Sequence, residues 1–535
     1  MKTNSATNAQ IAASDAKLST WLTANAGSGK TKVLIDRVAR LLLDGVQPEQ
    51  ILCLTYTKAA AAEMKNRLFD RLGKWAMLAD KELNFSLLEM GVHTQLGTEE
   101  LKKARTLFAR AIEVPGGLKI QTIHAFCASL LRKFPLEAGI SPQFRELDER
   151  GQRELYLKVL ELISKDKLTQ ESFEHFLKIA NASNWEEIIL KIVSKRHVFS
   201  KNKSRVEIFE AFNLNSNVSI DDDISAHFEQ NTLNLVRKIS DCLKKSLSKA
   251  DQKTAQELTE IASINLASIQ LLEKIFLYGK SAKSPFTAKL GKFSTKEMRS
   301  SFLVHFMDDI DDFMVRLEHF RNRRLSYQAA EASLSIHKFA ETFLAVYKAQ
   351  KHIKSLLDFD DLIDITVNLL TTAEVADWVL YRLDGGIDHI LVDEAQDTSP
   401  SQWRVIETLA QELTSGQGAR SSKPRTIFVV GDQKQSIYSF QGADPAQLDR
   451  VRDSFSAKLE GADKNLQVAS LDYSFRSSKT ILSLVDKIFG NTNKDSFGWG
   501  RNHLAFKADL PGRIDLWPII PKTMNPNLLK WEEPL

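Results

Sequence analysis

The fold is decided by a stretch of eight residues, Ala24-Asn25-Ala26-Gly27-Ser28-Gly29-Lys30-Thr31. It has an alanine, four variable positions and then Gly-Lys-Thr, which is a pattern of phosphate-binding loops. An apolar run of strand length precedes it at 18–24, and a helical pattern ending at Gly45 follows it. The glycines let backbone N–H groups approach a phosphate at the helix N-terminus. We therefore expect Lys30 to reach the β- and γ-phosphates of a nucleotide and Thr31 to place its hydroxyl on Mg²⁺. The alternative is a coincidental glycine-rich turn.

Strand-like and helical segments alternate around this loop. An apolar run at 51–56 is followed by an alanine-rich helical pattern at 57–72, and strand-like runs return at 387–393, 426–431 and 466–472. Strands that alternate with helices are typical of an α/β fold with a parallel sheet.

The alternation of strand-like and helical segments stops between residues 150 and 355. There the sequence is charged and helical in pattern and shows no clear buried strand. A chain that leaves a sheet and returns to it implies an insertion. We expect residues 1–150 and 356–469 to form one ATP-binding domain, 151–355 to be a mostly α-helical insertion, and 470–535 to begin a second α/β domain that is truncated.

Composition sets broad limits. The chain has 535 residues, a net charge of +4 and three cysteines, so it is too long for one core and has too few thiols for a disulfide scaffold or a four-thiolate metal site. There is no signal-peptide pattern and no apolar run of 18 residues. We expect a cytoplasmic protein. Residues 279–299 carry six basic side chains and one acidic one, which is compatible with a DNA-binding face or, more simply, a solvated surface.

The strand expected at 387–393 ends in Asp393-Glu394. A nucleotide-hydrolysing site needs a carboxylate for the magnesium shell and a second one to polarise the attacking water. Asp393 and Glu394 suit these two roles, respectively. An acidic turn at a strand end is common. The pair therefore indicates a nucleotide-hydrolysing site only in combination with the phosphate loop upstream.

The motifs taken in order resemble the UvrD/Rep-like superfamily 1 DNA helicases, and within them the AddA-type helicase–nucleases. The resemblance covers about residues 8–148 and 355–515. It is carried by LTYTKAAAAEMKNRL (54–68), IQTIHAFCASLLRKFP (120–135), DEAQD (393–397), GDQKQSIYSFQGAD (431–444) and SLDYSFRSSKTIL (470–482). It implies a RecA-like core, ATP with Mg²⁺, and both single-stranded and duplex DNA as ligands.

The resemblance also implies roles for single residues. Gln10 would hydrogen-bond adenine, and Phe475, where relatives usually have tyrosine, would stack on it. Gln435 would link the γ-phosphate to the DNA-facing loop, and Arg476 would be an arginine finger. The path of single-stranded DNA would be lined by Tyr56, His124, Tyr438 and Phe440. Core packing is an equal alternative for Tyr56 and His124.

The function implied is an ATP-dependent 3′-to-5′ DNA helicase in double-strand-break repair, acting with an AddB-like partner. The later helicase motifs and the nuclease domain are expected beyond residue 535. One alternative is therefore an ATP-dependent DNA-binding module that unwinds only with those motifs or with a partner. The other is a P-loop enzyme of a different class, such as a kinase.

Overall fold

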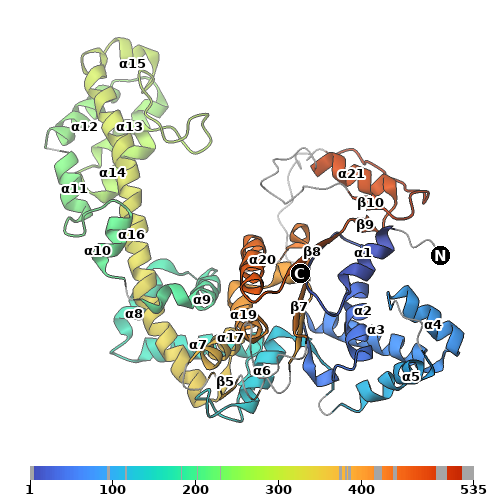
Figure 1. The fold of residues 1–535 in the computed structure, drawn as a ribbon. Helices are drawn as coiled ribbons and strands as arrows, with labels where there is room; N and C mark the ends of the chain where they lie inside the picture. The colour runs from blue at the N-terminus through green and yellow to red at the C-terminus, as the bar shows by residue number, and fades with distance from the viewer. Residues whose placement is uncertain are drawn as a thin grey trace, which may run out of the picture. The chain divides into compact units, whose positions relative to one another are not determined.

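The computed structural model describes residues 5–92, 97–114, 117–181, 183–201, 203–228, 230–372, 376, 378–379, 382, 387–414, 424–437, 443–489 and 503–520. The chain divides into two compact units (Figure 1). Unit 1 contains residues 1–146 and 357–535, and unit 2 contains residues 147–356. The expected start of a second α/β domain at residue 470 stays a prediction.

Unit 1 is built on a six-stranded sheet in which every strand pairs in parallel with its neighbours. In spatial order the strands are β3 (Lys119–Thr122), β2 (Ile51–Thr55), β6 (His389–Val392), β7 (Thr426–Gly431), β1 (Ser19–Ala24) and β8 (Leu466–Leu471). The expected α/β fold with a parallel sheet is confirmed. Five of these strands coincide with the apolar runs of the sequence.

Side chains of the central strands alternate between two hydrophobic cores, one on each face of the sheet. In β2, Leu52 and Leu54 belong to one core, and Ile51 and Cys53 belong to the other. Burial on both faces is the reason that these strands read as continuous apolar runs.

Helices cover both faces of the sheet in unit 1. The face that carries Ile51 and Cys53 packs against α2 (Lys30–Leu43), α3 (Lys58–Met77), α4 (Asp80–Glu89) and α5 (Thr98–Ile112). The face that carries Leu52 and Leu54 packs against α6 (Ile123–Lys133), α17 (Phe359–Thr371), α19 (Pro400–Thr414) and α20 (Pro445–Glu460). The remaining elements of unit 1 are α1 (Ser5–Ala13), η1 (Pro48–Gln50), β4 (Arg145–Glu146), η4 (Ala395–Asp397), η5 (Gln433–Gln435), β9 (Tyr473–Ser474), α21 (Lys479–Phe489), β10 (Leu504–Ala505) and β5 (Leu356–Leu357), which begins at the last residue of unit 2.

Side-chain caps fix where several helices begin. Thr57 accepts a hydrogen bond from the N–H of Ala60 at the start of α3, and Thr122 accepts one from Ala125 at the start of α6. Each cap satisfies one of the backbone donors that a helix N-terminus leaves unpaired. The caps therefore let β2 and β3 turn into helices within one or two residues, at the sheet edge where the candidate site lies.

Unit 2 is mostly helical in the residues that the structure describes, and its assignment as an insertion at 151–355 stays a prediction. Its long helix α16 (Met307–Ile353) has 47 residues, which corresponds to about 70 Å at 1.5 Å per residue. Different helices pack along its two halves (Figure 1). The other helices are α7 (Glu149–Lys165), α8 (Gln170–Ile179), α9 (Trp185–Ser194), η2 (Arg196–Ser200), α10 (Arg205–Ala211), α11 (Ile220–His227), α12 (Gln230–Leu243), α13 (Lys249–Thr259), α14 (Leu266–Phe276), α15 (Lys296–Ser300) and η3 (Val304–Phe306).

The basic stretch at 279–299 is only partly free to contact a ligand. Lys289 donates to the carbonyl of Ile275 at 2.6 Å, and Arg299 donates to the carbonyl of Ser294. The other four basic side chains are exposed or half-buried: Lys280, Lys283, Lys292 and Lys296. A role for this face in DNA binding stays a prediction.

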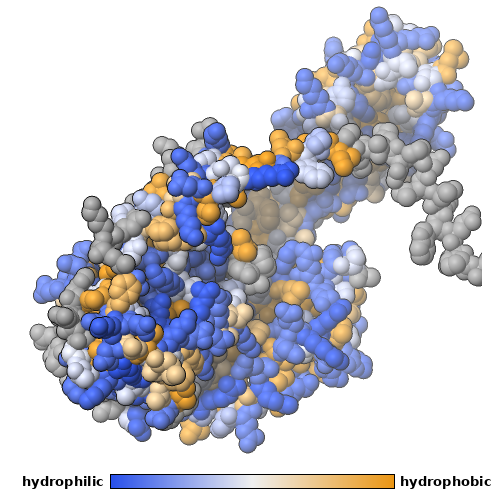
Figure 2. Space-filling view, turned by 90° about the vertical axis from the view of Figure 1, so that its right-hand side faces the viewer, coloured by the Kyte–Doolittle hydropathy of each residue, from blue (hydrophilic) through white to orange (hydrophobic). Residues whose placement is uncertain are grey.

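Hydrophilic residues dominate the face of the molecule in Figure 2, with hydrophobic residues dispersed among them. Across the part of the chain that the structure describes, none of the helices combines the length and the apolar character needed to cross a membrane.

Candidate nucleotide-binding site

The phosphate loop joins the end of β1 to the first residue of α2. Gly27 and Gly29 have φ values of +73° and +91°, which are costly for other residues. A Cβ on Gly29 would lie 2.6 Å from Nε2 of Gln10, so a side chain at this position would displace the Gln10 amide. The loop therefore needs glycine at both positions, and its backbone stays open for phosphate oxygens at the start of α2.

Gln10 lies against the phosphate loop, and its predicted hydrogen bond to adenine stays a prediction. Its Nε2 donates to the carbonyl of Ser28 at 2.9 Å, and its Oε1 accepts from Nζ of Lys32 at 3.0 Å. Lys32 was missed in the sequence, although its place two residues after Lys30 on the first helical turn is a usable signal. Burial, and then the charge of Arg71, lower the pKa of the Lys32 ammonium.

Lys30 and the carboxylates of β6 meet in one site. Nζ of Lys30 lies 3.0 Å from Oε2 of Glu394, although 364 residues separate the two in sequence. Glu394 has φ +50° and ψ +46°, a left-handed conformation that is uncommon for a residue with a side chain. Asp393 immediately before it is buried at the end of the strand, and its Oδ1 accepts the N–H of Glu394.

The environment of Asp393 fits a magnesium ligand. Burial, and secondly the charge of Glu394, raise the pKa of the Asp393 carboxyl to about 6. A buried carboxylate next to a second acid is stabilised when a cation arrives. Within the described ranges, no cluster of three His, Cys, Asp or Glu side chains could hold a metal alone. This suits Mg²⁺, which usually binds through one or two protein ligands and the phosphates of a nucleotide.

The raised pKa of Asp393 leads to a pH prediction. A protonated carboxyl cannot ligate Mg²⁺, so magnesium-dependent nucleotide binding should weaken about tenfold per pH unit below pH 6. Above pH 6 the carboxylate is ionised and the affinity should level off. Titrating a fluorescent ATP analogue between pH 5 and 8 measures this. The same titration in EDTA is the control, and an equally steep decline there would contradict the assignment to a metal ligand.

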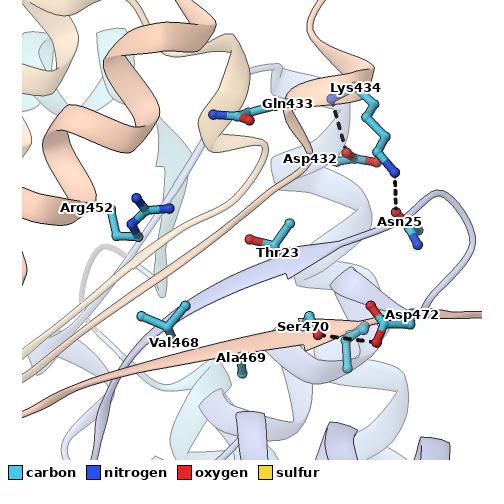
Figure 3. Close-up of a pocket in the computed structure, with 11 residues that line it drawn as sticks. Thr23, Asn25, Asp432, Gln433, Lys434, Arg452, Val468, Ala469, Ser470 and Asp472 are labelled. Atoms are coloured by element: carbon cyan, nitrogen blue, oxygen red, sulfur yellow. Dashed lines mark hydrogen bonds between the residues drawn. The ribbon is translucent and has the colours of Figure 1, made fainter. Parts of the chain in front are cut away.

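A cavity of about 320 Å³ opens beside the phosphate loop, at the carboxyl ends of β1, β7 and β8. Figure 3 shows Lys434 reaching from the turn after β7 to Asn25 of the loop, with Nζ to Oδ1 at 3.4 Å. In the same turn, Nε2 of Gln435 donates to Oδ2 of Asp432 at 2.6 Å. Gln435 thus belongs to the turn whose Lys434 contacts the phosphate loop, and its predicted role as a phosphate sensor stays a prediction.

Gln396, in the middle of DEAQD, was missed as a site residue. Its Nε2 donates to Oε2 of Glu394 at 2.7 Å, and its Oε1 accepts the N–H of Asp432 at 2.9 Å. It therefore bonds to the ends of two neighbouring strands. The available signal was a glutamine placed between two acids in a turn that follows a buried strand.

Residues 475–476 reach the phosphate loop from β9. The N–H of Phe475 donates to the carbonyl of Gly27 at 2.8 Å, and a Cβ on Gly27 would lie 2.6 Å from Cβ of Arg476. The Phe475 ring is partly exposed and packs on Phe506, with ring centroids 4.3 Å apart. The backbone placement agrees with a nucleotide-facing position. Adenine stacking and the arginine finger stay predictions.

The proposed DNA-contacting residues are only partly described. Tyr56 follows β2 and His124 begins α6 after β3, so both lie at the carboxyl edge of the sheet that carries Asp393. His124 packs edge-on against Phe359 at 5.2 Å, and burial lowers its pKa. This contact favours the packing alternative for His124. Tyr438 and Phe440 lie outside the described residues.

With this geometry established, comparison with known protein families identifies the class. The model of the UvrD/REP helicase N-terminal domain matches residues 4–198 and 190–456. The chain therefore belongs to the UvrD/REP helicase family, as its motifs predicted.

Among curated proteins the chain is similar to AddA, the ATP-dependent helicase/nuclease subunit, of several bacteria. The protein of Latilactobacillus sakei is 26% identical over 517 residues, which cover 89% of this chain and 54% of that protein. Those of Ligilactobacillus salivarius and Enterococcus faecalis are each 25% identical. The matches cover 91% and 89% of this chain and 39% and 37% of those proteins, respectively. The chain thus spans about half or less of the length of these relatives.

Proposed function

We propose that this chain is the ATP-binding part of a DNA helicase that acts in DNA repair. The observation that carries the proposal is the contact between Lys30 of the phosphate loop and Glu394 after β6. It brings the phosphate-binding and water-activating groups of an NTPase together from distant parts of the sequence. Family membership and the helicase relatives support DNA as the polymer on which this site acts.

In the proposed mechanism, a magnesium nucleotide supplies the free energy and the protein orients it. Lys30 and the loop N–H groups bind the phosphates, while Thr31 and Asp393 hold the metal shell. Glu394 then orients and polarises a water molecule, and Arg476 faces the charge that develops in phosphoryl transfer. Gln10 and Phe475 bind the adenine. The phosphate-loop motif and the acidic pair after β6 support the roles of Lys30, Thr31, Asp393 and Glu394. The resemblance of the motifs to the family supports the roles of Gln10, Phe475 and Arg476.

We further propose 3′-to-5′ translocation, contacts with single-stranded and duplex DNA, a cytoplasmic location and an AddB-like partner. These follow from the similarity to the AddA helicase/nucleases and not from the site itself. The chain spans only part of those relatives, so a DNA-binding module that unwinds DNA only in a larger assembly is the second candidate.

The two candidates are separated by two measurements on the purified chain. ATP hydrolysis is followed with and without an oligothymidylate, and strand displacement is followed on a duplex with a 3′ single-stranded tail. A DNA motor should hydrolyse ATP faster with DNA and displace the strand. ATP-linked DNA binding without displacement would favour the module. Hydrolysis that is indifferent to DNA would contradict both candidates and favour a P-loop enzyme of another class.

A further inference from the structure

The side chain of Gln396 is buried between the two strand ends that form the candidate site. It is 2% exposed. Its Nε2 donates to Glu394 at 2.7 Å and to Oδ2 of Asp397 at 3.2 Å, and its Oε1 accepts the N–H of Asp432. Both ends of this amide are therefore used, and each end bonds to a different strand terminus. Such a satisfied buried group fixes geometry, because breaking one of its bonds leaves a polar atom unpaired.

On the catalytic side, Gln396 and Lys30 share the same carboxylate oxygen. Both donate to Oε2 of Glu394, at 2.7 Å and 3.0 Å. When Lys30 turns to the phosphates of a nucleotide, the bond from Gln396 still holds Glu394. The left-handed backbone of Glu394 is a conformation that persists only when its surroundings impose it. The hydrogen bond from Gln396 is one of the contacts that impose it on Glu394.

On the opposite side, Gln396 is bonded twice to the turn that follows β7. Its Oε1 accepts the N–H of Asp432, and its backbone carbonyl accepts from Oγ of Ser436 at 3.2 Å. Asp432 in turn accepts from Nε2 of Gln435. A displacement of this turn therefore acts directly on the amide that holds Glu394.

We propose that Gln396 is a positioning residue that couples the turn at 432–436 to the orientation of Glu394. The proposal rests on the proposed function, with ATP at Lys30, and on the motif resemblance at 431–444, which implies that DNA faces the loop that begins with this turn. When bound DNA moves the turn, the N–H of Asp432 moves with it. The Gln396 side-chain amide is bonded to both Asp432 and Glu394, so it then changes the orientation of the Glu394 carboxylate. Gln396 itself exchanges no proton and touches no reacting atom. By linkage, nucleotide and DNA then alter each other's affinity by the same factor.

Three substitutions isolate this amide. Gln396→Met keeps the length of the side chain and removes its hydrogen bonds. Gln396→Glu keeps the acceptor for Asp432 but replaces the donor to Glu394 with a carboxylate. Gly431→Ala leaves Gln396 in place and adds a Cβ that would lie 2.9 Å from its Oε1. The φ of Gly431 is not in the left-handed region, and the added methyl would also lie 3.3 Å from Cβ of Ala395 and from the backbone N of Gln396, so it disturbs the turn around Gln396 as well as its side chain.

Gly461→Ala is the matched control for the last substitution. Gly461 ends α20, and a Cβ there meets its nearest atom at an ordinary 3.5 Å. It tests whether any added methyl in unit 1 has the same effect. Circular dichroism of all variants establishes that they are folded before the binding data are compared.

The experiment measures the affinity for an oligothymidylate with and without a non-hydrolysable ATP analogue. The wild-type chain should bind DNA with an affinity that the analogue changes severalfold. Gln396→Met and Gly431→Ala should bring that factor to within about twofold of one. Gly461→Ala should retain the wild-type factor. Coupling that survives in folded Gln396→Met would overturn the proposal.

Gln396→Glu provides a readout that a purely structural role would not give. At pH 8 the new carboxylate repels Glu394, and coupling should be lost. As the pH falls toward 6 the new carboxyl gains a proton, donates again to Glu394 and should restore part of the coupling, whereas the wild-type factor should change less. Coupling in Gln396→Glu that does not depend on pH would refute the proposal. A wild-type chain that binds no nucleotide would refute the proposed function as well, which distinguishes the two failures.

Discussion

Lys30→Ala is expected to lower the rate of ATP hydrolysis at least about a hundredfold, to the background of the assay. Lys30 is the first residue of α2 and meets Glu394 at 3.0 Å, and we propose that it reaches the phosphates of the nucleotide. Removing one preorganised group that stabilises transition-state charge costs about 10²–10³ in kcat. The substitution also leaves Glu394 without its ionic partner, so both halves of the site are affected.

The rate is measured by phosphate release at saturating oligothymidylate. Lys74→Ala is the control, because Lys74 is an exposed lysine in the last turn of α3. That variant should hydrolyse ATP at the wild-type rate. A Lys30→Ala chain that retains DNA-stimulated hydrolysis would remove Lys30 from the site and with it the proposed function.

The second large effect is expected in stability. Arg37→Ala should lower the free energy of unfolding by about 3 kcal/mol or more, because Arg37 is fully buried and its removal leaves several polar groups unpaired. Its guanidinium donates to the carbonyls of Asp15 and Leu18 and to the hydroxyl of Thr426, and it lies 5.0 Å from the ring centre of Phe428. It thus ties α2 to the turn before β1 and to β7.

Urea unfolding followed by circular dichroism measures this change. Arg67→Ala is the matched control, since Arg67 on α3 is half exposed and pairs with Glu63 four residues away. Its loss should cost about 0.5 kcal/mol or less. If the two substitutions lowered the free energy of unfolding equally, the buried contacts of Arg37 would contribute nothing to stability.

The apolar strands could be predicted from the sequence, including β8 at one edge of the sheet, whereas β3 at the other edge could not. Strands β1, β2 and β7 are largely buried on both faces, so they appear as apolar runs. Strand β3 was missed because Lys119–Thr122 is polar and mostly half-buried at the sheet edge. Helices α4 and α5 were also not predicted. They follow α3 without a strand between them, so the alternation of strands and helices gives no signal for them.

The candidate site was predictable where a local motif carries the chemistry. Lys30 and Asp393 belong to such motifs, and the fold brings them to the same sheet edge. Gln396 and Lys32 were missed because their contacts join segments that are distant in sequence, as in the bond from Gln396 to Asp432. A spacing pattern holds no information about which amide faces which strand end.

The single continuous helix α16 has a consequence for how the insertion tolerates change. Its first half packs in one hydrophobic core and its second half in another. Around its midpoint, Tyr327, Ala330 and Leu334 pack in a third core. Each residue advances an α-helix by about 100°. Deleting one residue between Leu334 and Phe339 would therefore rotate every later side chain by that angle and turn the face that packs in the last core away from its neighbours. The three cores are locked in rotational phase along one helix, and length changes between them are tolerated best in steps of about seven residues, close to two full turns.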